Sequence, residues 1–247
     1  MSLLGDLAAA FSYFSVLPVR HTDEPPGDGA IAFLPIVGLV IGALAGLGAY
    51  GVWLLVHNEI AAAIVAWVLS IALSGAIHVD GFLDACDGLF AMASPQRRLE
   101  IMRDPHHGTY AIVGGAIAGV LWLYALAQIP AVMMPAVLAI VSYFARWGGI
   151  SVAGTVPNAR TERTFRPSTQ ATLVLAIVTG LLFVSAGAKH GLQLLIGVVL
   201  SIAISYALGR FMSRRLGGVV NGDCYGAVIV VTEVALLLTY PALLRLQ

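Results

Sequence analysis

The sequence predicts an all-α fold, a polytopic bundle of transmembrane helices. Apolar residues make up 59% of the 247 residues, only 11% are charged, and the mean hydropathy is +0.91. A water-soluble domain of this length covers itself with more charge than that. The apolar residues also gather in runs of about 18 or more, the length that a helix needs to cross a bilayer.

Seven such runs predict about seven spans, and we interpret residues 1–247 as a single integral membrane domain. No Gly/Ser-rich linker or block of charge divides the chain. The predicted spans lie at about 33–56, 60–77, 109–128, 131–150, 171–188, 191–209 and 226–244.

The first residues predict an amphipathic helix at the membrane surface. Leu3, Leu7, Phe11 and Phe14 recur at intervals of four, four and three residues, which places them on one helical face. Cytoplasmic interfacial helices are expected in the polar segments that follow the second span.

Basic residues are unevenly divided between the two sets of loops. On the side of the N-terminus lie Arg20, Arg97, Arg98, Arg103, Arg160, Arg163, Arg166, Arg210, Arg214 and Arg215. The opposite side holds only Lys189 and Arg245. Because loops rich in Lys and Arg stay in the cytoplasm, we expect the N-terminus and these long loops to be cytoplasmic, in an inner membrane.

Bulk charge and cysteine content exclude other classes. The formal net charge is zero, so no nucleic-acid partner is expected. Cys86 and Cys224 fit neither a disulfide framework nor a zinc cluster.

The most informative segment follows the second span and reads HVDGFLDACDG over residues 78–88. Its carboxylates Asp80, Asp84 and Asp87 stand at i, i+4 and i+7, so a helix would place all three on one face. Three like charges in register repel one another unless a cation neutralises them. Mg²⁺ takes oxygen ligands, commonly one or two carboxylates with substrate phosphates. We therefore predict a metal site here, with a solvated acidic helix end as the alternative.

Three neighbours of the aspartates, Gly81, Gly88 and His78, each allow two interpretations. Gly81 and Gly88 weaken the helix but allow a ligand or a neighbouring backbone to come close. His78 is a candidate base or orienting residue, with amphipathic packing as the alternative.

A second acidic group follows in RRLEIMRD, residues 97–104. Glu100 and Asp104 are again four residues apart, and either one could complete the metal site. Arg97 and Arg103 would then meet phosphate oxygens. The alternative is an amphipathic connecting helix held by ion pairs.

A third segment precedes the last span. Arg214 and Arg215 are followed by a glycine-rich turn that leads to Gly222 and Asp223. Backbone N–H groups and the positive end of the following helix make this a candidate phosphate cradle.

Three further charged residues complete the candidates. Glu233 lies within the last span, where a carboxylate is costly and is a functional candidate by default. Arg146, near a span end, either extends to the interface or binds an anion. Arg160 belongs to a basic loop that could bind lipid phosphates or an anionic substrate. Together these residues indicate Mg²⁺-assisted transfer of a phosphate-linked group on the cytoplasmic side.

The motifs resemble those of the cobalamin synthase family, the adenosylcobinamide-GDP ribazoletransferases. The resemblance is carried by residues 78–88, LEIMRD at 99–104 and GTY at 108–110, and it extends to RRLGG at 214–218 and NGD at 221–223. FLPIVG at 33–38 is similar to the early family motif. The chain departs from the family pattern at residues 105–107, where it has PHH, and at Asn221.

The resemblance implies transfer of the adenosylcobinamide-phosphate group from adenosylcobinamide-GDP to α-ribazole or its 5′-phosphate, with release of GMP. The implied cofactor is Mg²⁺, and the implied catalytic residues are His78, Asp80, Asp84, Asp87 and Asp104. The implied metal ligands are Asp80, Asp84, Asp87, Glu100, Asp104 and Asp223. Phosphate or substrate contacts are expected from Arg97, Arg103, Arg146, Arg160, Arg214, Arg215, Gly222 and Asp223. The general base remains open between His78 and an aspartate that holds no metal.

Membrane lipid is an expected partner, as is a second copy of the chain or other enzymes that assemble the lower loop of the coenzyme. Two alternatives differ in testable ways. A membrane alcohol phosphotransferase or prenyltransferase would accept lipid substrates. A divalent-cation transporter would carry its charges near the bilayer midplane and would support ion flux in liposomes.

Overall fold

The computed structural model describes residues 2–19 and 26–244, except for the side chains of residues 188, 189 and 242–244. In this part of the chain every regular element is a helix, which confirms the predicted all-α class. Arg20 and Arg245, which were counted when the basic residues of the two sets of loops were compared, lie outside the described residues, as does the side chain of Lys189. The helices are α1 (Leu3–Phe14), α2 (Asp28–Ala32), α3 (Leu34–Val56), α4 (Glu59–Leu73), α5 (Ile77–Phe90), α6 (Pro95–Ile101), α7 (Thr109–Leu126), the 3-10 turn η1 (Ala131–Met133), α8 (Met134–Thr155), α9 (Thr169–Arg215) and α10 (Gly222–Leu244).

Six helical segments of the described chain are long and apolar enough to cross a membrane. They are α3, α7, η1 with α8, the two parts of α9, and α10. The predicted span at about 60–77 is α4, which ends at Leu73 and meets α5 at an angle of 88°. Taken together, α4 and α5 can form one broken span. About seven spans are therefore confirmed, with the correction that the second is short and bent.

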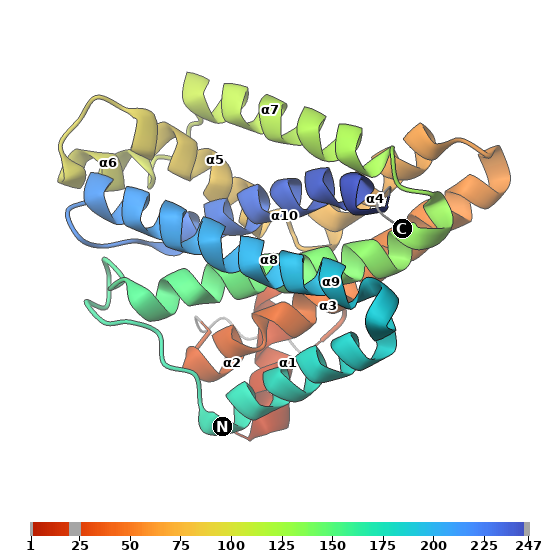
Figure 1. The fold of residues 1–247 in the computed structure, drawn as a ribbon. Coiled ribbons are helices and arrows are strands. Elements are labelled where there is room, and N and C mark those ends of the chain that lie inside the picture. The colour runs from red at the N-terminus through yellow and green to blue at the C-terminus, as the bar shows by residue number, and fades with distance from the viewer. Residues whose placement is uncertain (1, 20–25, 245–247) are drawn as a thin grey trace.

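The two sharp direction changes have backbone causes. Gly75 and Ala76 have φ angles of 61° and 60°, and these left-handed values end α4 and redirect the chain into α5. Gly187 has a φ of 62° and divides α9 into Thr169–Gly187 and His190–Arg215. The chain reverses direction at this break in Figure 1, so the predicted spans 171–188 and 191–209 are both present as separate helical segments.

Small residues allow the helices of the bundle to approach closely. Gly38, Gly42 and Gly46 form one stripe of α3, and a Cβ atom at each of them would collide with α8. Stripes of small residues at intervals of four are typical of packed transmembrane helices. The outer surfaces of the same bundle expose large apolar side chains such as Leu55 and Val184, as expected for helices that face lipid.

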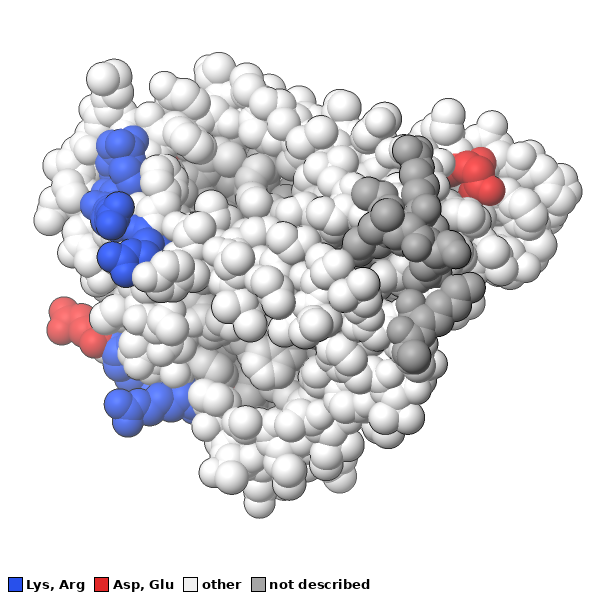
Figure 2. Space-filling view, viewed as in Figure 1, with Lys and Arg blue, Asp and Glu red and all other residues white. Residues whose placement is uncertain are grey.

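The charged loops share one end of the bundle. The α5–α6–α7, α8–α9 and α9–α10 connections lie together in Figure 1, opposite the α3–α4 and α7–α8 connections. Figure 2 shows Lys and Arg side chains gathered at that end, and the described residues over the rest of this face include no Lys or Arg. This arrangement agrees with the loop alternation that the arginine distribution predicted.

The predicted N-terminal helix is α1, and it is packed on the bundle. Ser2 caps its first turn by accepting from the N–H of Gly5 at 3.2 Å. Leu7 and Phe11 pack against the main apolar core, and Phe14 is buried within it. The helix therefore uses its predicted apolar face, Leu3 excepted, for contact with α2 and α3.

A buried ion pair links α8 to α10. Arg146 donates from Nη1 to Glu233 Oε1 at 2.6 Å and to the Ser142 carbonyl at 3.1 Å. Ser142 Oγ also donates to Glu233 at 3.0 Å. Arg146 is only 3% exposed, because α8 continues to Thr155 and places it well inside the helix. Both predicted candidates are thus partners of one another within the bundle.

Replacing Glu233 by Gln should destabilise the protein, because the Arg146 charge would stay buried without its counter-ion. Removing one partner of a buried pair costs about 3–5 kcal/mol, so the thermal unfolding temperature of the detergent-solubilised protein should fall clearly. The double variant Glu233→Leu with Arg146→Met removes both charges and should recover most of that loss. Equal losses in the single and double variants would contradict a direct ion pair.

Candidate functional site

One cavity at the basic end of the bundle brings together three of the predicted motifs. Its volume is about 470 Å³, and residues of α1, α2, α3, α5, α8, α10 and the connecting loops line it. The carboxylate, guanidinium and amide side chains that line it are Asp80, Arg103, Asn158, Arg160, Asn221 and Asp223. Carboxylates and guanidinium groups thus face one space from segments that lie far apart in the sequence.

The close crossing of α5 and α10 positions the carboxylates. A Cβ atom on Gly81 would lie 3.0 Å from Asp223 Cα, and one on Gly226 would lie 2.8 Å from the carbonyl oxygen of His78. Gly81 therefore admits a neighbouring backbone, one of the two alternatives predicted for it. The contact places Asp80 and Asp84 of α5 beside Asp223 in the first turn of α10, and these three groups interact electrostatically.

The late motif is fixed by its own polar contacts. Asn221 caps α10 by accepting from the N–H of Cys224 at 3.2 Å, and its side-chain nitrogen donates to Asp223 Oδ2 at 2.6 Å. Val220 pairs with the loop after α8, where its carbonyl accepts from the Ala159 N–H at 2.7 Å. This pairing brings Arg160 to the cavity.

Asp87 has a different environment from Asp80 and Asp84. It is buried, and its two carboxylate oxygens accept from the N–H groups of Gly108 at 2.5 Å and Ala111 at 2.9 Å. N–H groups at the start of a helix have no partner within it, so Asp87 caps the start of α7. It also holds the 102–108 loop against α5.

His107 enters the site through that anchored loop. Its Nδ1 lies 3.4 Å from Asp84 Oδ1, and its Nε2 lies 3.9 Å from Asp80 Oδ1. No sequence pattern pointed to this histidine, which stands where the chain departs from the family pattern. Asn158, which donates to the hydroxyl of Tyr225 at 3.3 Å, was likewise not predicted.

His78 is buried at the junction of two cavities. Its ring stacks on Phe14 of α1, with centroids 6.3 Å apart and planes at 22°. It lines both the large cavity and a small one of about 60 Å³ that also contacts Arg146 and Glu233. Its Nε2 has no hydrogen-bond partner among the described residues.

The predicted acidic residues of the α6 segment point elsewhere. Glu100 pairs with Arg97 at 2.8 Å, and both side chains are largely exposed. Asp104 accepts from the backbone N–H of His106 at 3.0 Å and lies 2.9 Å from its ring Nδ1. These contacts hold the pKa of the Asp104 carboxyl below its usual value. The ion-paired connecting segment, the alternative considered for these residues, describes their contacts better than a shared site with Asp80.

The predicted basic residues likewise divide into those that line the cavity and those that lie away from it. Arg103 and Arg160 line the cavity. Arg215 donates from Nε at 3.0 Å and from Nη2 at 2.6 Å to the carbonyl of Leu89, to which the buried Arg98 also donates. Both cations therefore serve the carboxyl end of α5, where the helix dipole favours them. Arg214 is exposed and does not line the cavity.

The donors at the cavity suit a cation that a substrate would help to hold. Among the described residues, no group of three His, Cys, Asp or Glu side chains is placed to hold a metal ion by itself. Mg²⁺ does not require such a group, because it commonly binds one or two carboxylates together with phosphate oxygens. Asp80, Asp84 and Asp223 interact electrostatically, and one or two of these carboxylates beside phosphate oxygens are enough for Mg²⁺, so the residues fit a phosphate-bound ion.

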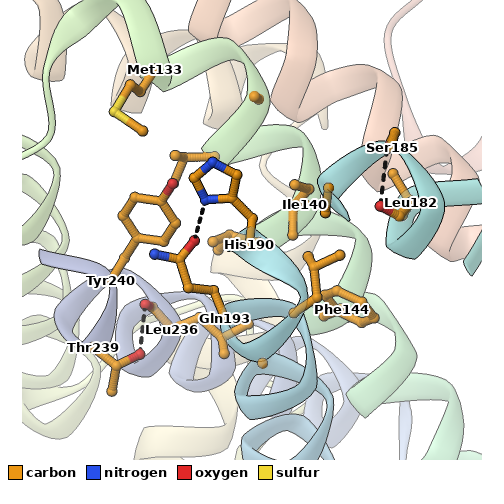
Figure 3. A pocket seen from close by; sticks show the side chains of 16 residues that line it. Met133, Ile140, Phe144, Leu182, Ser185, His190, Gln193, Leu236, Thr239 and Tyr240 are labelled. Atoms are coloured by element: carbon orange, nitrogen blue, oxygen red, sulfur yellow. Dashed lines mark hydrogen bonds between the residues drawn. The ribbon is translucent and has the colours of Figure 1, made fainter. Parts of the chain in front are cut away.

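A further cavity, of about 280 Å³, lies at the other end of α8 and α10, near the break in α9 (Figure 3). Its walls are mainly apolar, with Ile140, Phe144 and Leu236 among them. His190 and Gln193 form a hydrogen bond of 3.0 Å at its edge. It contains none of the predicted site residues.

The fold and the larger cavity define a polytopic helical membrane protein with an acidic and basic pocket at one end of its bundle. The chain belongs to the cobalamin-5-phosphate synthase family, whose model matches residues 6–241. The resemblance inferred from the motifs is therefore confirmed, and it covers nearly the whole chain.

Curated relatives are named adenosylcobinamide-GDP ribazoletransferases. The Deinococcus radiodurans protein is 35% identical over 94% of this chain and 83% of its own length. The Roseiflexus sp. protein is 34% identical, with 94% and 88% covered, and the Clostridium acetobutylicum protein is 30% identical, with 99% and 98% covered. No solved structure matches the chain. The family is thus one of transferases.

Replacing Asp87 by Ala should free the start of α7. Loss of a helix cap costs about 1 kcal/mol, so the unfolding temperature should fall, and the amides of Gly108 and Ala111 should exchange with deuterium faster. Asp80→Ala is the control, since the Asp80 side chain is 66% exposed and caps no helix. If Asp87 is only a metal ligand, both amides will exchange in Asp87→Ala as they do in the unchanged protein.

Proposed function

We propose that the protein transfers the adenosylcobinamide-phosphate group of adenosylcobinamide-GDP to α-ribazole or its 5′-phosphate and releases GMP. One observation carries the proposal: the segments that define the family also supply the carboxylates and arginines of a single cavity. The names of the relatives support the substrates.

The reaction is a substitution at phosphorus. A ribose hydroxyl of the acceptor forms a new P–O bond to the phosphorus nearest the corrinoid. The P–O bond to the GMP portion breaks, and GMP leaves with the electron pair. A bound Mg²⁺ would supply charge neutralisation on the pyrophosphate, and one or two of Asp80, Asp84 and Asp223 would hold it together with phosphate oxygens.

The protein's own groups then have distinct tasks. Arg103 and Arg160 are placed to bind phosphate oxygens of the leaving portion, since guanidinium groups match phosphate in charge and geometry. The hydroxyl proton needs an acceptor near the carboxylates. His78 and any aspartate free of metal are candidates, and His107 joins them because it lies within 3.4 Å of Asp84.

Setting and partners follow from the same proposal. The basic end, with the N-terminus and the cavity, would face the cytoplasm from an inner membrane, since arginine-rich loops stay on that side. Lipid would surround the apolar outer surfaces. A second copy, or other enzymes of lower-loop assembly, would contact the protein, and no nucleic acid is involved.

The purified, detergent-solubilised protein should release GMP only when adenosylcobinamide-GDP, α-ribazole and Mg²⁺ are all present, and EDTA should stop the release. Asp84→Asn should lower the rate about 100-fold or more, as when one electrostatic stabiliser of a transition state is lost. Asp6→Asn, a matched change on α1 away from the cavity, is the control.

Normal turnover by Asp84→Asn would refute the assignment of this carboxylate. No GMP release from folded, lipid-supplemented protein would refute the transferase proposal, and liposome flux and lipid acceptors would then be measured.

A further inference from the structure

The cavity has two chemically different parts. Its polar part is formed by the aspartates and arginines described above. The remaining wall is largely apolar and is contributed by α1, α2, α3, α8 and α10 through Tyr13, Phe14, Ile31, Leu34, Ile150 and Ile229. A ligand that fits both parts must have a flat or bulky apolar end and a polar end that reaches the charged residues.

We propose that this cavity encloses the acceptor nucleoside, with its benzimidazole base against the apolar wall, while the corrinoid remains outside. The proposal rests on the transferase function above and specifies which substrate occupies the cavity.

The volume favours the smaller substrate. Pockets of about 300–1,000 Å³ enclose molecules of drug size, and the cavity measures about 470 Å³. A benzimidazole nucleoside is of that size. A corrin macrocycle with its side chains is several times larger, so it can approach the cavity only from outside.

The chemistry of the wall favours binding of the acceptor base over binding of the donor's guanine. Guanine carries hydrogen-bond donors and acceptors around its edge, and burying them against aliphatic side chains would leave them unpaired at a substantial cost. The outer ring of a benzimidazole bears only carbon and hydrogen. Ile31 and Ile77, which line the cavity and are half-buried, can therefore cover a benzimidazole without any such loss.

Helix α1 supplies an aromatic side to the same wall. Phe14 is 9% exposed and packs on His78, which fixes its ring. Tyr13 packs against Phe14 edge to face, with centroids 5.0 Å apart, and stays 45% exposed at the cavity. Aromatic side chains commonly stack on nucleic-acid bases. With the base on this side, the ribose would lie toward Asp80 and Asp223, where the donor's pyrophosphate is held.

The test compares Michaelis constants for the two substrates in two variants. Tyr13→Ala removes an exposed aromatic surface, and Ala153→Leu adds volume at a residue that lines the cavity. Each should raise the KM for α-ribazole about tenfold and leave the KM for adenosylcobinamide-GDP within about twofold. Ala153→Leu should also favour an unmethylated benzimidazole riboside over the dimethylated one. Tyr124→Ala, at an exposed tyrosine of α7 away from the cavity, is the matched control.

The outcomes separate this proposal from the function on which it rests. If the unchanged protein releases GMP but the variants raise the KM for the donor, or change neither KM, the placement of the acceptor is overturned and the transferase function stands. If the unchanged protein releases no GMP, both are overturned. Should Ala153→Leu fail to fold, the Tyr13→Ala comparison decides alone.

Discussion

The contact between α5 and α10 is the constraint on which the site depends. Two helices can approach so closely only where neither carries a side chain, and Gly81 and Gly226 meet that condition from opposite sides. The contact joins residues that are more than a hundred positions apart in the sequence. It sets carboxylates from both helices at one cavity, where their mutual repulsion favours a cation or the arginines of the neighbouring loops. The position of the aspartates at the cavity therefore depends on the glycines beside them, which permit the close contact of α5 and α10.

The surrounding loops are tied to this crossing by polar contacts. Asp87 holds the turn before α7, so that His107 lies over Asp84. The pairing of residue 158 with Val220 holds the basic loop after α8 against the start of α10. Arg98 and Arg215 satisfy the carboxyl end of α5. The first two contacts satisfy backbone groups and at the same time fix His107 beside Asp84 and Arg160 at the cavity. The contacts of Arg98 and Arg215 stabilise the end of α5 and add no side chain to the cavity.

Much of this architecture was predictable because it depends on local pattern. The lengths of the apolar runs predicted the spans, and the distribution of arginine agreed with them. The i, i+4, i+7 spacing predicted that a helix at this place would carry its aspartates on one face. Residue spacing could not show that Asp87 would accept hydrogen bonds from the first N–H groups of α7, since Ala111 lies 24 residues away in the sequence. The pairing of Arg146 with Glu233 is equally remote. The bend between α4 and α5 was missed because Ala76 adopts a left-handed conformation that its residue type does not favour.

The central claim is that Asp84 of α5 and Asp223 of α10 act in one site. The most direct measurement is the rate of GMP release, in single turnovers, by Asp84→Asn, Asp223→Asn and the double variant. Groups that act as a unit give strongly non-additive losses. The account predicts that the double variant is about as slow as the slower single variant. A loss in the double variant equal to the product of the two single losses would show that the two carboxylates act independently.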